Sequence, residues 1–130
     1  MFLTPLYSAA RSRAVCYVLD IDDCRLLLDC GWSDAFDPAV VSALRSVAGS
    51  IDAVLLSHAS LEHAGALPAL ISQLRAKCSV FATQPVFRFG HLVAYDTFFG
   101  RSHDPSFAAF SLDDADTAYK ARERRRGAGT

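Results

Sequence analysis

Residues 52–68 read DAVLLSHASLEHAGALP, and they are the most informative segment of the sequence for its fold and its function. The mostly apolar run at 51–57 predicts a short strand that is buried on both faces of a sheet. A polar loop is expected at 58–63, and Gly65 is expected to begin a helix with leucine and isoleucine side chains on one face. Because ligands gather at the carboxyl ends of strands in open α/β sheets, the loop is the first place to look for a functional site.

The flanking sequence repeats this alternation of strand and helix. The pair Asp22-Asp23 predicts a hairpin turn, and Asp37-Pro38 predicts the start of a helix, with Asp as the N-cap and Pro in the first turn. The other predicted strands are 14–21, 24–29 and 78–82, and the other predicted helices run from Pro38 to Gly49, from Thr83 to Gly100, and onward from Leu112. This order predicts an α/β layered domain.

The composition fits one folded domain of 130 residues, with 52% apolar residues and a formal net charge of −1. It excludes a disordered chain, and there is no apolar run of about 18 residues that would predict a membrane span. Residues 1–119 carry 8 basic and 13 acidic side chains, a net charge of −5, whereas residues 120–130 carry five basic and one acidic, a net charge of +4. The main body is therefore not a basic nucleic-acid-binding domain. We expect residues 120–130 to form a basic helical end or tail.

The four cysteines, Cys16, Cys24, Cys30 and Cys78, form no Cys-x-x-Cys pair and fit no zinc-finger spacing. The first residues lack the basic and apolar regions of a secretory signal. We therefore expect reduced, structural cysteines in an intracellular protein.

The residues themselves leave two interpretations of the polar loop open. His58, Glu62 and His63 could supply three ligands to zinc or iron, which favour imidazole and carboxylate donors. The loop could equally be polar because it is exposed to water. We expect Trp32 to be a packing residue, and Phe87, Phe89, Tyr95, Phe98 and Phe99 to belong to the core.

Two separated blocks resemble the metallo-β-lactamase superfamily, in the branch that processes nucleic acids. The block at 27–31 reads LLDCG and places Asp29 at a strand end, as in the first motif of that family. The block at 52–68 resembles the second motif, His-x-His-x-Asp-His, which this branch continues with Gly-Ala-Leu-Pro. The resemblance implies an αββα sandwich, of which residues 1–119 would form the N-terminal half only. Such a half would leave an apolar sheet face uncovered.

The second motif departs from the family pattern at two positions. Ser60 replaces the second histidine and Glu62 replaces the aspartate, whereas His58 and His63 are kept. Hydrolysis with two metal ions needs both ions close together, and a serine hydroxyl is a poor zinc ligand. The resemblance therefore implies a degenerate motif with no metal, no catalytic residue and no cofactor, zinc included. Asp29 would orient the histidine loop or cap its amides by hydrogen bonds.

Further blocks, at 27–32, 51–58, 82–86, 94–96 and 107–116, resemble a non-catalytic subunit of the machinery that cleaves and polyadenylates pre-mRNA. This implies a nuclear pseudo-nuclease that serves as a scaffold for its catalytic sister subunit, for other cleavage and polyadenylation factors and, through the complex, for pre-mRNA. Its RNA-binding residues are unknown, and no membrane partner is implied. Two alternatives stay open: a metal-dependent RNA or phosphoester hydrolase with an altered ligand set, and a non-catalytic paralogue in the Integrator complex.

Overall fold

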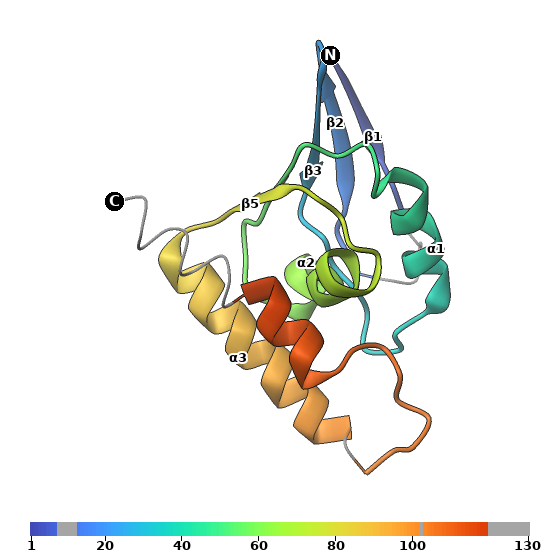
Figure 1. The fold of residues 1–130 in the computed structure, drawn as a ribbon, viewed down its shortest axis with the longest axis vertical. Coiled ribbons are helices and arrows are strands. Elements are labelled where there is room, and N and C mark those ends of the chain that lie inside the picture. The colour runs from blue at the N-terminus through green and yellow to red at the C-terminus, as the bar shows by residue number, and fades with distance from the viewer. Residues whose placement is uncertain (8–12, 102, 120–130) are drawn as a thin grey trace.

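The computed structural model describes residues 1–7, 13–101 and 103–119 (Figure 1). The strands are β1 (Phe2–Pro5), β2 (Tyr17–Ile21), β3 (Cys24–Leu28), β4 (Ala53–Leu55) and β5 (Ser79–Phe81). The helices are α1 (Pro38–Val47), α2 (Leu61–Ala64), the π-helix η1 (Ala69–Gln73) and α3 (Gln84–Arg101). A last helix is described over 112–119. The predicted tail at 120–130 lies outside the described residues.

The five strands form one mixed sheet in the order β1-β2-β3-β4-β5. The first three strands pair antiparallel, and β3, β4 and β5 pair parallel, with α1 connecting β3 to β4. The hairpin predicted around Asp22-Asp23 is confirmed: Asp22 has a φ of 51°, which aspartate tolerates in a tight turn. The predicted α/β class is confirmed as well.

Helix α1 begins as its sequence predicts. The Asp37 side chain accepts a hydrogen bond from the Ala39 N–H at 2.9 Å, and Pro38 occupies the first turn, where its missing N–H costs nothing. Its apolar face, with Val40, Leu44 and Val47 buried, packs against η1.

The predicted helix beginning at Gly65 is wrong, and so is the predicted loop over the whole of 58–63. Ser60 is the N-cap of the short helix α2, which contains Glu62 and His63, and Gly65 ends this helix. A separate helix, η1, begins after Pro68. The Ala66 N–H donates to the Cys30 carbonyl at 2.9 Å, outside the helix, and Pro68 has no N–H with which to continue the preceding turn, so the chain forms two short helices instead of one.

Strand β1 was not predicted from the sequence. It lies at the edge of the sheet, where Pro5 is tolerated because its missing N–H breaks no central ladder. All four residues of β1 are exposed, so the strand lacks the alternation of buried and exposed side chains that would have indicated it.

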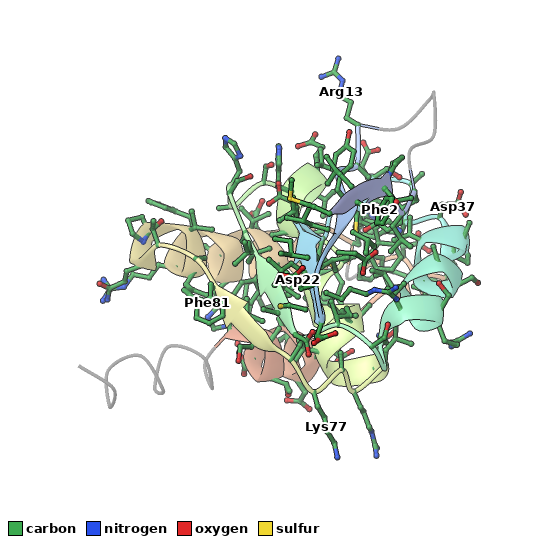
Figure 2. All side chains as sticks on the ribbon, turned by 90° about the horizontal axis from the view of Figure 1, so that it is seen from above. Phe2, Arg13, Asp22, Asp37, Lys77 and Phe81 are labelled. Atoms are coloured by element: carbon green, nitrogen blue, oxygen red, sulfur yellow. The ribbon has the colours of Figure 1, made fainter. Side chains whose placement is uncertain are left out.

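The core lies on one face of the sheet. The cross-strand row Val18, Leu27, Val54 and Val80 is buried, and helices cover this side. The next row along the strands points to the opposite face because side chains alternate. In that row Leu55 is 37% exposed and Phe81 is 57% exposed (Phe81 is labelled in Figure 2). These values agree with the expected uncovered apolar face of the sheet.

The aromatic residues of α3 were only partly predicted correctly. Phe87 is buried, whereas Phe89 and Phe99 are more than half exposed. The helix therefore packs through one narrow stripe and carries an exposed apolar stripe as well. In the described part of the chain no helix has the length and apolar character needed to span a membrane.

Candidate functional site: a histidine turn held by serines

The site lies where the adjacent parallel strands β3 and β4 end. The Asp29 N–H donates to the Leu55 carbonyl at 2.8 Å, so the residue after β3 is fixed beside the end of β4. Ser57 and His58 follow β4, and α2 then brings Glu62 and His63 to the same edge. We call residues 57–63 the histidine turn.

Asp29 is the anchor of the histidine turn. It is only 7% exposed and has a φ of 61°. Its Oδ1 accepts a hydrogen bond from the Ser57 N–H and its Oδ2 accepts one from the Ser57 hydroxyl, both at 2.7 Å. The carboxylate therefore binds the first residue of the turn through both of its oxygens.

The Ser57 contact determines the tautomer of His58. A serine hydroxyl has one proton, and that of Ser57 points to Asp29. At its 2.9 Å contact with His58 Nδ1, the Ser57 oxygen can only accept a hydrogen bond. His58 must therefore carry a proton on Nδ1, and its imidazole lies exposed at the surface.

A second serine holds the second histidine. The Ser60 hydroxyl lies 2.8 Å from His63 Nδ1, and the Ser60 side chain makes no cap bond to the helix backbone. The rings of His58 and His63 have centroids 4.4 Å apart and are tilted by 39°. The two histidines that the sequence singles out are thus brought together, each with its Nδ1 beside a serine.

Backbone hydrogen bonds hold the turn against the segment that follows β3 and the segment that precedes β2. The Cys30 N–H donates to the His63 carbonyl at 2.8 Å, the Trp32 N–H to the Leu61 carbonyl at 2.9 Å, and the Val15 N–H to the Glu62 carbonyl at 2.8 Å. Gly31 lies at the closest approach: a Cβ there would be 1.6 Å from the Glu62 carbonyl oxygen. The position therefore requires glycine for space.

The layer beneath the turn is chemically inert. Burial raises the pKa of the Cys16 thiol to about 12 and that of the Cys30 thiol well above its usual value. The pKa of Tyr7 is also raised, mainly because its hydroxyl is buried and to a smaller extent because Cys30 and Cys16 lie close to it. The Tyr7 hydroxyl donates a hydrogen bond to the Gly31 carbonyl at 2.6 Å. These groups stay neutral and act as packing and hydrogen-bonding residues.

Among residues 1–7, 13–101 and 103–119, no three or more histidine, cysteine, aspartate or glutamate side chains are grouped so that they could hold a metal ion. Both oxygens of Asp29 and the Nδ1 atoms of both histidines already lie against serines. The donors that remain in the turn are the Nε2 atoms and the Glu62 carboxylate.

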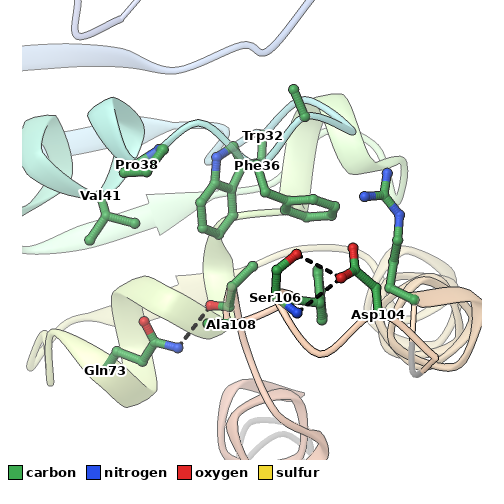
Figure 3. A pocket seen from close by; sticks show the side chains of 12 residues that line it. Trp32, Phe36, Pro38, Val41, Gln73, Asp104, Ser106 and Ala108 are labelled. Atoms are coloured by element: carbon green, nitrogen blue, oxygen red, sulfur yellow. Dashed lines mark hydrogen bonds between the residues drawn. The ribbon is translucent and has the colours of Figure 1, made fainter.

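A separate pocket of about 290 Å³ was missed by sequence reasoning (Figure 3). Its wall includes Trp32, which is 2% exposed, as predicted for a packing residue, and whose indole N–H donates to the Asp37 carbonyl at 3.0 Å. Its other side comes from residues 104–109, about seventy positions further along the chain. The two aromatic residues of the block at 107–110 are the one sequence signal that could have indicated it.

Residues 18–124 match the metallo-beta-lactamase superfamily domain, and the chain belongs to this family. Within it, the chain is similar to cleavage and polyadenylation specificity factor subunit 2 of Oryza sativa, at 48% identity over 118 residues, covering 91% of this chain and 16% of that protein. It is also 43% identical to the subunit 2 of Arabidopsis thaliana, covering 91% of this chain and 16% of that one. The probable subunit 2 of Drosophila melanogaster is 46% identical over 81% of this chain and 14% of that protein.

The chain thus spans about a sixth of the length of these relatives. Among solved structures, human tRNase Z, short form, matches with a TM-score of 0.51 and 20% identity, over 78% of this chain and 40% of that chain. At this identity the match bears on the fold alone. The resemblance to the metallo-β-lactamase superfamily, and to the N-terminal part of a cleavage and polyadenylation subunit within it, is confirmed.

Proposed function

We propose that this chain acts in pre-mRNA 3′-end processing, as a non-catalytic metallo-β-lactamase-type subunit of the cleavage and polyadenylation machinery in the nucleus. The proposal is supported by the relatives named cleavage and polyadenylation specificity factor subunit 2, at 43–48% identity. Its role would be that of a scaffold for a catalytic nuclease subunit and for other factors of the complex.

The observation that carries the non-catalytic assignment is the contact between Ser60 and His63. Ser60 stands where the family motif has a metal-binding histidine, and its hydroxyl lies 2.8 Å from His63 Nδ1. A neutral hydroxyl is a poor zinc ligand, and the Asp29 carboxylate is used to hold Ser57. This donor set does not fit a pair of ions, and hydrogen bonds supply the positioning that metals supply elsewhere in the family.

The negative charge of residues 1–119 supports a role in protein contacts rather than in direct RNA binding. Residues 1–119 have a net charge of −5, and a phosphate backbone is bound mainly through lysine and arginine. Pre-mRNA would therefore be reached through the complex. The partly exposed row that contains Leu55 and Phe81 gives the chain an apolar face for packing against protein.

Co-purification tests this function. The tagged chain, expressed in cells and recovered from nuclear extract, is expected to bring down the catalytic nuclease subunit and other cleavage factors. A second tagged chain that carries Leu55→Ser and Phe81→Ser tests whether the apolar face contributes to binding these proteins. These two substitutions leave the buried core unchanged. Recovery of Integrator subunits instead, or of no processing factor, would contradict the proposal.

Metal content tests the non-catalytic assignment separately. The close approach of the His58 and His63 rings, at 4.4 Å, is the observation that favours the alternative, a hydrolase with an altered ligand set. We expect purified protein to contain well under one zinc per chain and to cleave no RNA. Stoichiometric zinc, with activity lost in His63→Ala and retained in His91→Ala, would establish the hydrolase instead. Ser60→His restores the motif histidine and is expected to raise zinc content.

A further inference from the structure

Helix α3 has apolar side chains on two opposite faces, and it lies along one side of the molecule, beside the last helix (Figure 1). The inner face packs against the rest of the chain through the buried residues Phe87, Gly90 and Ala94. Spacings of three and seven residues place Phe89, Leu92 and Phe99 together on the opposite, outer face, where they are 59%, 62% and 58% exposed. Because the outer face of a surface helix is normally polar, this apolar stripe indicates a contact surface.

Two opposite charges flank the centre of the outer face. Arg88 precedes Leu92 by four residues, Asp96 follows it by four, and both charged residues are exposed. Side chains four residues apart form one of the ridges by which helices pack, so this ridge is basic, apolar and acidic in that order. Arg88 also has an interaction within its own chain, but a guanidinium carries five N–H donors and can serve a second acceptor.

This order of charges is complementary to itself in an antiparallel pair of helices. A two-fold axis beside Leu92 brings Arg88 of each copy close to Asp96 of the other, because the two residues are equally far from Leu92. Pro85, which is exposed, and Phe99 are likewise seven residues before and after Leu92, so they also come together. A parallel pair would instead place like charges beside each other. Interdigitation of such ridges, with helices crossed at about −50°, is the commonest way in which helices pack.

We propose that the outer face of α3 binds a second copy of this chain, in an antiparallel helix pair centred on Leu92. The two Leu92 side chains pack near the two-fold axis, Phe89 and Phe99 pack on either side, and two Arg88–Asp96 ion pairs fix the direction of the helices. The proposal depends neither on the histidine turn nor on the proposed function.

The size of this face predicts a weak dimer. A phenylalanine side chain buries about 150–250 Å² when it is fully enclosed, so the exposed parts of Phe89, Leu92 and Phe99 amount to roughly 300 Å² per copy. With the charged side chains and Pro85, the interface approaches the lower limit for specific complexes, which is roughly 1,000 Å² in total. We therefore expect a dissociation constant on the order of 10–100 μM.

Charge variants test the antiparallel pairing by sedimentation equilibrium of the 130-residue chain at low salt. Arg88→Glu makes both charges of the ridge acidic, and Asp96→Lys makes both basic. Each variant alone is expected to dimerise at least about tenfold more weakly than the parent chain. An equimolar mixture of the two variants restores both ion pairs, so it is expected to form a heterodimer about as stable as the parent dimer.

Matched controls make the same charge changes elsewhere. Arg45→Glu, on α1, and Asp23→Lys, in the β2–β3 turn, alter exposed residues and are expected to leave the dissociation constant unchanged. Leu92→Glu removes the apolar centre and is expected to abolish dimerisation. Circular dichroism of each variant, matched to the parent chain, shows that a lost dimer reflects the outer face of α3 and not the fold.

Three outcomes overturn the proposal. One is a parent chain that stays monomeric over a concentration range that includes the expected dissociation constant. Another is a dimer that the charge variants leave unchanged, or a mixture of the two variants that does not associate. The third is a dimer that is lost with Leu55→Ser and Phe81→Ser and kept with Leu92→Glu, which would assign the contact to the uncovered sheet face.

Discussion

Asp29 and Ser57 are joined by two hydrogen bonds of 2.7 Å, although 28 positions separate them in the sequence. Asp29 follows β3 and Ser57 follows β4, so the pair ties the ends of two parallel strands. The same carboxylate directs the hydroxyl proton of Ser57 and thereby sets the tautomer of His58. One buried side chain thus fixes the first residue of the histidine turn and sets the tautomer of His58.

Replacing Asp29 tests this relationship. Asp29→Ala removes both acceptors and leaves an alanine at a φ of 61°, so we expect a loss of about 2–4 kcal/mol in the free energy of unfolding, measured by urea denaturation. Asparagine at position 29 keeps an acceptor for the Ser57 N–H and tolerates this backbone conformation, so Asp29→Asn should lose clearly less free energy of unfolding.

The Asp29→Asn variant should also change the tautomer of His58. The new amide can donate to the Ser57 hydroxyl, which then donates to His58. Nitrogen NMR should therefore show the His58 proton moving from Nδ1 to Nε2. An Asp29→Ala variant as stable as the parent chain would contradict the role of Asp29.

Gly31 is expected to be intolerant of any side chain. A Cβ there meets the Glu62 carbonyl carbon at 2.4 Å and its oxygen at 1.6 Å, and both belong to the backbone. Gly31→Ala should therefore displace α2 and cost about 3 kcal/mol or more, seen as a lower melting temperature and a changed His58–His63 environment. Gly49→Ala is the matched control, because nothing lies within 4 Å of its Cβ position and its φ is not positive. Equal effects of the two substitutions would refute the steric explanation.

The sequence predicted well those elements whose signals are local. Asp37-Pro38 predicted the start of α1, and the apolar run before His58 predicted the buried centre of β4. It failed where two local signals compete. The apolar spacing after Gly65 favours a helix that begins there, whereas Ser60 already caps the short helix α2. Gly65 ends α2, because the next N–H, that of Ala66, donates to the Cys30 carbonyl outside the helix.

The site was predicted in its residues but not in its contacts. His58, Glu62, His63 and Asp29 were all singled out, yet the part played by Ser57 and Ser60 in holding the two imidazoles was not. The Ser57–Asp29 contact depends on the approach of β3 to β4, whereas the Ser60–His63 contact is local to α2. The pocket beside Trp32 brings together segments far apart in the chain, and no periodicity indicates such a pairing. The Ser57–Asp29 contact and the pocket both depend on long-range packing, which a single sequence does not display.

Acid should weaken the attachment of the last helix. Burial raises the pKa of Asp114, but hydrogen bonds from Ser72, Ser111 and Gln73 outweigh it, so that the pKa lies below its usual value. A depressed pKa in the folded state means that this stabilisation is complete above the ordinary carboxyl pKa and is lost as the pH falls through the folded value.

The matched variant for this prediction is Asp114→Asn. We expect it to cost about 1 kcal/mol at pH 7, where the carboxylate of the parent chain caps the helix and binds Ser72. The parent chain should lose more stability than the variant between about pH 5 and pH 2, and the two curves should converge. Parallel curves over this range would show that Asp114 does not titrate with folding.

Thiol labelling should detect opening of the histidine turn. In the native chain Cys24 is exposed, whereas Cys16, Cys30 and Cys78 are buried. With a pKa of about 12, Cys16 has a thiolate fraction of about 10⁻⁴ at pH 8, and Cys30 is also protected by burial. Ellman's reagent should therefore modify one thiol per chain quickly, and Cys24→Ser should remove that phase.

The slow phases carry the information about the site. Because the Cys30 N–H is bonded to the His63 carbonyl, we expect Cys30 to become accessible when α2 separates from the segment that follows β3. In a Cys24→Ser background, Asp29→Ala should speed the labelling of Cys30 roughly tenfold or more, since loss of the Ser57 anchor favours local opening by at least about 1.4 kcal/mol. Gly49→Ala, remote from the turn, should leave this rate unchanged. Fast labelling of Cys30 in the Cys24→Ser variant without any further substitution would show instead that the histidine turn is not held by the hydrogen bonds described above.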